Sequence, residues 1–550
     1  MKIQILENGF YYDNNVFNDS STISDVLKYP DCDGVDYTTF CPKGRVLSEA
    51  QQETADFMME NKRCYVFNGM GTGKTMSSLM VILALLRMKP GYRVLIISSK
   101  TVLASGWVPE VQAVCPWCPI ILCEGTHEKK KKILENRNNQ LVGCSADSLH
   151  IVPRGSFDMI IADEATLFKS AQGVGGSARG KQMCELASHN NTERLVLMTG
   201  TPRAHSCMDA YGLYFVMNDK YRRGKTGMVL NKTMFRNALC VPMDFQTYYI
   251  CKGYKTPEQW DKWKGTTCGG LFINDSLEDF RDRLNHCSRD AKNMWIERPN
   301  ANESLMSLLS PAIAFRTEDV LDLPDCPIID VHLDMSDEDR ATLNKMKRDM
   351  LLDFEDKKDI ISNKMVLEGK MEQVNCGLVY DSDGAGRILL SSVYKSALKF
   401  VLTHAQRLPS GRGLVIASRY NHILYTVYKA LEIVLGSGCV NMINGEVSSK
   451  DRTRFVNEFR NGTTRILLAN TACLSHGVTL VEANEMILLD TPQYTEPYVQ
   501  VKGRVHRRGQ KWPIPIYRLI GNATVGRRFN ILEGAEERDD DFVRLISRDE

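Results

Sequence analysis

Short apolar runs alternate with amphipathic stretches over two parts of the chain. In the first part, residues 47–201, the runs are YVF, VLII, IIL, MIIA and LVLM, at residues 65–67, 94–97, 120–122, 159–162 and 195–198. In the second part, from residue 394 onward, they are GLVIAS, RILLA, MILLD and IYRLI, at residues 413–418, 465–469, 486–490 and 516–520. Strands separated by helical patterns are typical of a parallel sheet covered by helices. The pattern therefore predicts an α/β protein with two parallel-sheet lobes in tandem.

The remaining segments lack this alternation. The chain opens with KIQILENGFYY, where Asn8-Gly9 between alternating apolar residues predicts a β-hairpin. Residues 215–310 are polar, aromatic and irregular, which predicts an insertion, and the charged residues 336–358 predict a helical connection. We expect an N-terminal accessory segment over 1–45, a first lobe over 46–325 with its insertion at about 215–310, a helical connection or protrusion over 326–393, a second lobe over 394–525 and a C-terminal tail over 526–550.

Composition indicates a soluble globular protein. Of the 550 residues, 43% are apolar and 25% are charged, and the net charge of +2 argues against a basic coat, so that nucleic acid would have to bind in a local groove. The 17 cysteines are scattered, and the first residues show no signal-peptide core. The longest apolar run, residues 79–86, is too short to span a bilayer. We expect an intracellular, cytoplasmic protein without membrane contact, in the host cytoplasm if it is viral, with a nuclear location as the alternative.

The stretch VFNGMGTGKTMSSLMV carries the most specific signal. An apolar strand leads through a glycine-rich turn with Gly69, Gly71 and Gly73 to Lys74 and Thr75 at the start of a helix. Such a loop surrounds phosphates with backbone N–H groups at the positive end of a helix dipole, while the lysine reaches the terminal phosphates and the threonine binds Mg²⁺. The strict pattern has glycine at the position of Asn68; the alternative is a simple glycine-rich turn. The stretch predicts an ATP and Mg²⁺ site.

Phosphate chemistry also requires carboxylates at the end of a neighbouring strand. The stretch DMIIADEATLFKS supplies Asp163 to hold Mg²⁺ and Glu164 to polarise the attacking water. Taken alone, an acidic pair after a strand could equally begin a helix. The phosphate loop upstream favours the catalytic interpretation. The later turn Thr199-Gly200-Thr201-Pro202 could sense the state of the phosphate site, or could be a turn only.

These motifs point to a family. GMGTGKT, DEAT, TGTP and QVKGRVHRRGQ, in this order and spacing, resemble the superfamily-two helicases, and most closely the Swi/Snf-type DNA translocase ATPases. The stretches LIISSKTVLASGWVPE, FRTEDVLDLP and ANTACLSHGVTLVEA resemble further family motifs. The resemblance implies two RecA-like lobes and an ATP hydrolase. Thr166 in place of histidine, Leu474-Ser475 in place of a glycine pair and Gln493-Tyr494-Thr495 in place of Trp-Asn-Pro are typical of a divergent, compact member of viral, phage or bacterial origin.

The resemblance also implies roles for individual residues. Gln51 would read the adenine, Gln500 and Gly477 would lie at the nucleotide, and Arg504 and Arg507 would reach across the cleft to the transferring phosphoryl group. Ser99 and Lys100 in the first lobe, with Asn470 and Thr471 in the second, would face the nucleic acid. A solvated surface patch is the alternative for the arginines. For Lys502, Arg508 and Lys511 we expect a solvated or backbone-contacting role.

We therefore expect a motor that translocates on duplex DNA, through sequence-independent backbone contacts, and remodels DNA structures or displaces bound proteins, in repair or replication. A helicase that separates or reanneals strands of forked DNA or RNA shares every motif quoted. A nucleotide-gated DNA clamp with little turnover is a further alternative. We expect a monomer, with residues 1–45 or the insertion available to protein partners.

Cys115-Pro-Trp-Cys118, with Cys123 nearby, has the spacing of half a zinc site. A second pair at suitable spacing is missing from the sequence, so a structural role for these cysteines is favoured over metal binding.

Overall fold

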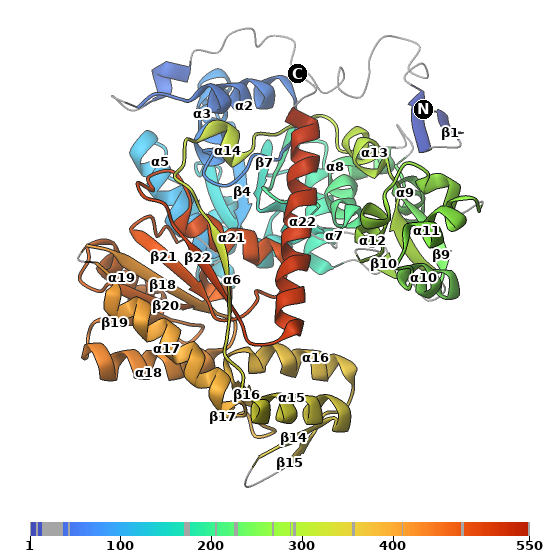
Figure 1. The fold of residues 1–550 in the computed structure, drawn as a ribbon. Helices are drawn as coiled ribbons and strands as arrows, with labels where there is room; N and C mark the ends of the chain where they lie inside the picture. Colours follow the sequence, from blue (N-terminus) through green and yellow to red (C-terminus); the bar gives the residue numbers. More distant parts are fainter. Residues whose placement is uncertain are drawn as a thin grey trace. The chain divides into compact units, whose positions relative to one another are not determined.

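A computed structural model of the chain describes most of its residues. Described are residues 2–6, 9–13, 37–41, 45–169, 177–203, 206–224, 229–266, 269–285, 288–289, 293–354, 358–409, 411–474 and 478–547. The chain divides into two compact units, Met1–Val320 with Arg538–Glu550, and Leu321–Glu537. Each unit contains its own parallel sheet, so the predicted fold class of two RecA-like parallel-sheet lobes is confirmed (Figure 1).

The first unit is built on a seven-stranded sheet in which all neighbouring strands are parallel. The strand order is β12-β3-β8-β7-β4-β6-β5. In chain order the strands are β3 (Arg63–Val66), β4 (Val94–Ser98), β5 (Ile121–Leu122), β6 (Leu141–Ser145), β7 (Met159–Asp163), β8 (Arg194–Met198) and β12 (Ala312–Ile313). Because β3, β8 and β7 are neighbours, the residues that follow these three strands lie together at one edge of the sheet.

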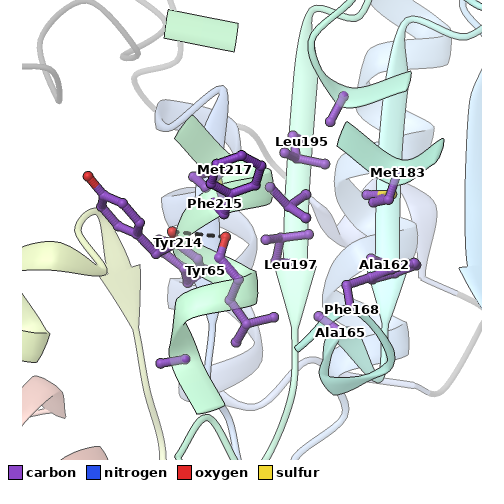
Figure 2. Packing of buried hydrophobic residues seen from close by; sticks show 14 of the residues in the cluster. Tyr65, Ala162, Ala165, Phe168, Met183, Leu195, Leu197, Tyr214, Phe215 and Met217 are labelled. Atoms are coloured by element: carbon purple, nitrogen blue, oxygen red, sulfur yellow. Dashed lines mark hydrogen bonds between the residues drawn. The ribbon is translucent and has the colours of Figure 1, made fainter. Parts of the chain in front are cut away.

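Both faces of this sheet are buried, as the continuous apolar runs predict. Leu95 and Ile97 of β4 belong to one hydrophobic cluster, and the alternate residues Val94 and Ile96 belong to another. Figure 2 shows side chains of the first cluster, packed between the strands and the neighbouring helices. The helices and helical turns of this part are η2 (Tyr37–Phe40), α2 (Glu49–Glu60), α3 (Lys74–Met88), α4 (Lys100–Val102), the π-helical turn η3 (Leu103–Trp107), α5 (Val108–Val114), α6 (His127–Glu135), η4 (Ala146–Ile151), η5 (Ala165–Phe168), α7 (Ala178–Ala187), η6 (Cys207–Ala210) and α8 (Tyr211–Gly224).

The predicted insertion forms a small module with its own core. A three-stranded antiparallel sheet, in the order β10-β11-β9, packs with helices around Trp260, Trp263 and Phe280. Its elements are α9 (Lys232–Leu239), β9 (Cys240–Asp244), α10 (Phe245–Lys252), α11 (Pro257–Lys264), η7 (Gly269–Phe272), α12 (Leu277–Asn285), β10 (Ser288–Arg289) and β11 (Asn293–Glu297), followed by α13 (Ala301–Leu308) and α14 (Thr317–Val320). Its aromatic residues, which made the sequence look irregular, are the ones that fill this core.

The predicted N-terminal hairpin is confirmed. Strands β1 (Lys2–Leu6) and β2 (Gly9–Asp13) are antiparallel, with Leu6 opposite Gly9.

The second unit contains a six-stranded parallel sheet in the order β13-β22-β21-β18-β20-β19. Its strands are β13 (Ile328–His332), β18 (Gly413–Ser418), β19 (Val440–Ile443), β20 (Ile466–Asn470), β21 (Ala483–Leu488) and β22 (Ile516–Ile520). Its helices are α17 (Ser391–Arg407), α18 (Asn421–Leu435), α19 (Ser449–Arg460), α20 (Thr471–Leu474) and α21 (Thr495–Val505). The last helix, α22 (Ala523–Ser547), places Phe529 in the core of this unit and Phe542 in the core of the first.

The expected helical connection is only partly helical. Helix α15 (Asp337–Asp349) ends where Met350 adopts a left-handed backbone, φ 53°, and the hairpin β14 (Leu351–Asp353) and β15 (Lys358–Ile360) follows. Helix α16 (Lys364–Gln373), the turn η8 (Val374–Cys376) and a second hairpin, β16 (Leu378–Tyr380) and β17 (Gly386–Ile388), complete it.

No helix in the described part of the chain combines the length and the apolar character needed to cross a membrane.

Candidate active site

The glycine-rich loop joins β3 to α3. Gly71 and Gly73 have φ of 80° and 94°, a left-handed conformation that favours glycine. A Cβ atom on Gly69 would lie 2.5 Å from Oγ1 of Thr317, so this position also requires glycine. Gly73, the N-cap of α3, offers no side-chain cap. The first N–H groups of α3 therefore point toward the loop without the capping side chain that most helices have, as in an anion site.

Lys74 lies over this loop. Its Nζ donates hydrogen bonds to the carbonyl oxygens of Asn68 and Gly69, at 2.6 and 2.9 Å. The ammonium group is thus held at the centre of the loop, where a phosphate would sit. Thr75 follows in the first turn of α3, and is half-buried.

Asn68, the departure from the strict glycine pattern, ties the loop to α2. Its side chain is buried, and Nδ2 donates to Oγ1 of Thr54 at 2.8 Å. Gln51 comes from the same helix: its Oε1 accepts from the backbone N–H of Ser48 at 3.0 Å, and a Cβ atom on Gly73 would lie 1.9 Å from its Nε2. The structure therefore brings Gln51 against the phosphate loop, as the predicted site requires.

The predicted carboxylates lie at the same edge of the sheet. Asp163 is the last residue of β7 and is buried, while Glu164 is half-buried with φ 61° and ψ 54°. A residue other than glycine rarely adopts this conformation, which costs about 1–3 kcal/mol and is found most often at functional sites. Burial raises the pKa of Asp163, while the indole N–H of Trp107 and the ammonium of Lys74 act to lower it. Lys74 and Asp163 therefore interact electrostatically within one site.

Two further segments contact the loop. The turn after β8 lies close to the loop, since a Cβ atom on Gly200 would lie 3.6 Å from the backbone oxygen of Asn68 and 3.9 Å from Gly69. On the other side, the backbone N–H of Gly69 donates to the oxygen of Phe315 at 2.7 Å, and Oγ1 of Thr317 donates to the oxygen of Met70 at 2.9 Å. The phosphate loop is thus held from both sides. The contact with Thr317 was not predicted, because it joins residues 247 positions apart in the sequence.

The sequence also gave no role to Trp107. Its side chain is fully buried, and Nε1 donates to Oδ2 of Asp163 at 2.9 Å. Trp107 lies in the stretch LIISSKTVLASGWVPE, which carries part of the family resemblance, but no sequence signal pointed to Asp163 as the partner of its indole.

In the second unit, the predicted arginines lie at the end of α21. Arg504 is in its last turn, and Nη1 of Arg507 donates to Oγ1 of Thr479 at 2.8 Å. Burial, with the nearby charge of Arg460, lowers the pKa of Arg507. Gln500, on the same helix, makes a 3.4 Å hydrogen bond from Nε2 to Oε1 of Glu496. Gly477 lies outside the described residues.

Comparison with known proteins decides the family. A model of the SNF2-related domain matches residues 50–377, and a model of the helicase conserved C-terminal domain matches residues 395–509. The chain belongs to the SNF2-related family. The predicted resemblance to Swi/Snf-type ATPases is therefore confirmed, and membership places the chain among helicase-like, ATP-dependent proteins.

Relatives of this SNF2-related chain include a phage protein and much longer cellular proteins. Putative protein p41 of Acyrthosiphon pisum secondary endosymbiont phage 1 is 22% identical over 85% of this chain and 91% of its own length. A Caenorhabditis elegans homolog of the SWI/SNF-related regulator of chromatin subfamily A containing DEAD/H box 1 is 22% identical over 85% of this chain and 48% of its own. An uncharacterised ATP-dependent helicase of Mycoplasma genitalium is 22% identical over 84% of this chain and 38% of its own length. The chain spans less than half of the last two.

One solved structure aligns with most of the chain. The Sulfolobus solfataricus SWI2/SNF2 ATPase core in complex with dsDNA is 17% identical and covers 92% of this chain and 93% of its own, with a TM-score of 0.35.

The residues that the SNF2-type resemblance assigns to the nucleic acid are at strand ends, but most of their side chains make local contacts. Oγ of Ser99 accepts from the N–H of Val102 at 3.3 Å as the N-cap of α4, and Lys100 is exposed. The Asn470 amide donates to the oxygen of Arg419, and Thr471 is buried. Among these four, Lys100 is the one that presents an exposed side chain.

Lys502 differs from the expectation of a solvated or backbone-contacting role. Its Nζ lies 2.7 Å from Oε2 of Glu536 on α22, and both side chains are largely buried. The prediction was wrong because the partner lies 34 positions further along the chain, on α22.

The cysteine pair gives no support for a metal site. Cys115 and Cys118 are both buried, and burial raises the pKa of the Cys115 thiol to about 12. In the described ranges, no three His, Cys, Asp or Glu side chains are grouped so that they could hold a metal ion.

Proposed function

We propose that this SNF2-related chain is a DNA-dependent ATPase that translocates along duplex DNA, remodelling DNA structures or displacing bound proteins. The observation that carries the proposal is that Lys74 of the glycine-rich loop and the buried carboxylate of Asp163 lie at the same edge of the first sheet, where they interact electrostatically. A lysine in a glycine-rich loop and a buried carboxylate two strands away are two of the charged groups that nucleoside triphosphate hydrolysis uses.

The first unit fits ATP and Mg²⁺. The uncapped N-terminus of α3, with Gly69, Gly71 and Gly73, offers backbone N–H groups to phosphates, and the Lys74 ammonium already lies among backbone oxygens that a phosphate would replace. Thr75 and Asp163 would hold Mg²⁺, which when bound neutralises charge on the phosphates. Gln51, packed on Gly73, would lie beside the base.

Hydrolysis then needs a group that orients water and groups that stabilise the developing charge. Glu164, held in a left-handed conformation next to Asp163, would orient the water. Arg504 and Arg507 would supply positive charge to the transition state; an arginine in this role contributes about 10³–10⁵ in rate. Gln500, one turn before Arg504, would support the same segment.

Duplex DNA is the preferred track. Following one backbone of a duplex requires no opening of base pairs, whereas separation costs about 1.4 kcal/mol per base-pair step and needs a wedge. Lys100, with Ser99, Asn470 and Thr471 at the strand ends, would contact phosphates, so that binding would weaken steeply with salt.

The test is a set of ATPase rates measured side by side with blunt duplex, single-stranded and forked DNA and with RNA. We expect the largest stimulation with duplex DNA. Greater stimulation by forked DNA or RNA would favour a strand-separating helicase. Tight DNA binding without stimulated turnover in any of the four would favour a nucleotide-gated clamp.

A further inference from the structure

The buried indole of Trp107 contacts the carboxylate that the proposed function assigns to Mg²⁺. Trp107 is 0% exposed, and its Nε1 donates to Oδ2 of Asp163 at 2.9 Å. Both residues lie in the first unit. An indole has one N–H, which can only donate, so its single polar group is committed to this carboxylate.

The backbone around Trp107 is irregular at this point. The chain leaves β4, forms the short helix α4 and then the π-helical turn η3, which ends at Trp107, before it continues as α5. A π-helical turn inserts an extra residue into a helix and rotates the side chains that follow; such turns are frequent at functional sites. The irregular turn places the Trp107 side chain within an apolar cluster, and the indole N–H reaches Asp163, the last residue of β7.

A carboxylate that binds Mg²⁺ must present its oxygen in a fixed direction, because Mg²⁺ requires near-ideal octahedral geometry. Hydrogen bonds from the surroundings supply this orientation, and removing such a partner typically lowers metal affinity or activity by about 10–100-fold. With Oδ2 bonded to the indole, rotation of the Asp163 carboxylate about its Cβ–Cγ bond is restricted.

We infer that Trp107 is a positioning residue that fixes the Asp163 carboxylate for Mg²⁺. The inference rests on the proposed ATPase function and deepens it: the indole N–H, and not only the bulk of the ring, sets the affinity of the site for the metal. Trp107 would act through Asp163, without contacting the nucleotide or the metal itself.

The experiment compares two replacements of Trp107 with a matched control. Trp107→Phe removes the N–H and part of the ring, while 3-benzothienylalanine at the same position removes the N–H and keeps the shape. The control is Trp260→Phe in the insertion module, because Trp260 is also buried. Its Nε1 also donates a hydrogen bond, to the backbone oxygen of Asp275 at 3.2 Å. Thermal unfolding of each variant shows which are folded.

The first measurement is Mn²⁺ binding in the presence of a non-hydrolysable ATP analogue, followed by electron paramagnetic resonance. Both Trp107 replacements should weaken nucleotide-dependent Mn²⁺ binding by about tenfold or more, and the half-saturating Mg²⁺ concentration of the ATPase should rise in parallel. Nucleotide binding without metal should change less than twofold. Trp260→Phe should match the wild type.

The second measurement uses the six tryptophans of the chain, labelled with 5-fluorotryptophan. The ¹⁹F resonance of Trp107 is identified as the one that disappears from the spectrum of Trp107→Phe, and that of Trp260 in the same way from Trp260→Phe. In the wild-type protein with bound analogue, the Trp107 resonance should shift when Mg²⁺ is added, whereas the Trp260 resonance should not.

The outcomes separate the two proposals. If the wild type neither binds Mn²⁺ with nucleotide nor hydrolyses ATP, the proposed function fails, and the inference fails with it. If the wild type does both, and the benzothienylalanine variant binds Mn²⁺ as tightly as the wild type, the inference alone is overturned.

Discussion

A carboxylate follows a buried apolar strand in both units, yet the two carboxylates have different surroundings. In the first unit, Asp163 ends β7, receives the indole N–H of Trp107 and interacts with the ammonium of Lys74. In the second unit, Asp490 comes two residues after β21 and is fully buried; it accepts hydrogen bonds from the hydroxyl of Ser418 and from the N–H of Arg419. Burial raises the pKa of Asp490 to about 6.

The comparison shows that a strand followed by aspartate does not by itself indicate catalysis. The runs MIIAD and MILLD are almost the same, and each places a carboxylate at the carboxyl end of a parallel sheet. The partner makes the difference: Asp163 interacts with the lysine of a phosphate loop, whereas Asp490 binds groups at the end of the neighbouring strand β18. These surroundings support the proposed role of Asp163 in hydrolysis, whereas for Asp490 we expect an effect on the stability of the second unit.

If the second unit contributes to chemistry through its arginines and not through Asp490, the largest effect should come from Arg507→Ala. The guanidinium would act mainly in the transition state, so hydrolysis should fall by about 10³–10⁵-fold, while ATP and DNA binding should stay within a few-fold. Arg508→Ala is the matched control, because Arg508 is adjacent and exposed. Single-turnover hydrolysis and binding titrations measure both effects; lost DNA affinity with normal turnover would indicate a surface patch instead.

Lys74→Ala tests whether the lysine of the glycine-rich loop acts with Asp163 in the first unit. The change removes the cation beside Asp163, and turnover should fall by at least about 10²–10³-fold. The fold should persist, because Lys74 lies at the start of a helix and its hydrogen bonds to Asn68 and Gly69 are made within the loop itself. Steady-state ATPase rates measure the loss of turnover, and circular dichroism melting shows whether the fold persists. The control is Arg87→Ala, at the other end of α3. Substantial turnover in Lys74→Ala would refute the loop assignment.

Asp490→Asn should change stability and leave chemistry nearly intact. The pKa of Asp490 is raised in the folded state, to about 6 from its ordinary 3.8, so the folded chain holds more protons than the unfolded chain between these values. Folding stability should therefore fall as pH rises from about 4 to about 6, by on the order of 3 kcal/mol from this group.

Denaturant unfolding of the second unit at several pH values should show that Asp490→Asn lacks this decline. Charged groups near Asp490 include Arg419, which lowers its pKa, and Glu372, which raises it, and the titratable side chains of Cys376 and Tyr420 also interact with it. A decline of equal size in both proteins would mean that other groups cause it.

The smallest effect is expected from Asn68→Gly, which restores the strict glycine pattern. The change removes the hydrogen bond to Thr54 and adds backbone freedom, so the free energy of unfolding of the first unit should drop by about 1–2 kcal/mol. The ATPase rate should remain within a few-fold, because the glycines proposed to contact phosphate are unchanged. A gain in stability would show that the Asn68 amide does not anchor the loop.

Much of the fold followed from local sequence patterns. The nine predicted strands of the two sheets all correspond to observed ones, because parallel strands buried on both faces are continuous apolar runs. The strands β6, β12, β13 and β19 were not predicted. β13, with the sequence IIDVH, is only partly buried, and its pairing with β22 joins residues far apart in the sequence, so no local pattern identifies it.

The sequence located the glycine-rich loop and the carboxylates that the structure brings to one edge of the first sheet, because the expected chemistry restricts both residue type and spacing. The roles of Trp107, Thr317 and Lys502 were not predicted, since they depend on contacts 34 or more positions away. Asn470 was placed correctly at a strand end, but its amide bonds to Arg419 and Asn421, which lie about 50 positions earlier. The sequence predicts where a strand ends more readily than which neighbours its last side chain meets.

The most direct test of the central claim is displacement of a third strand from a blunt duplex. With ATP, the wild-type chain should release the third strand without unwinding the duplex, and Lys74→Ala should not. Release should also weaken steeply with added salt, since the track is held through phosphates. If no third strand is released while a forked duplex is efficiently unwound, the chain is not a duplex translocase, and the strand-separating function takes its place.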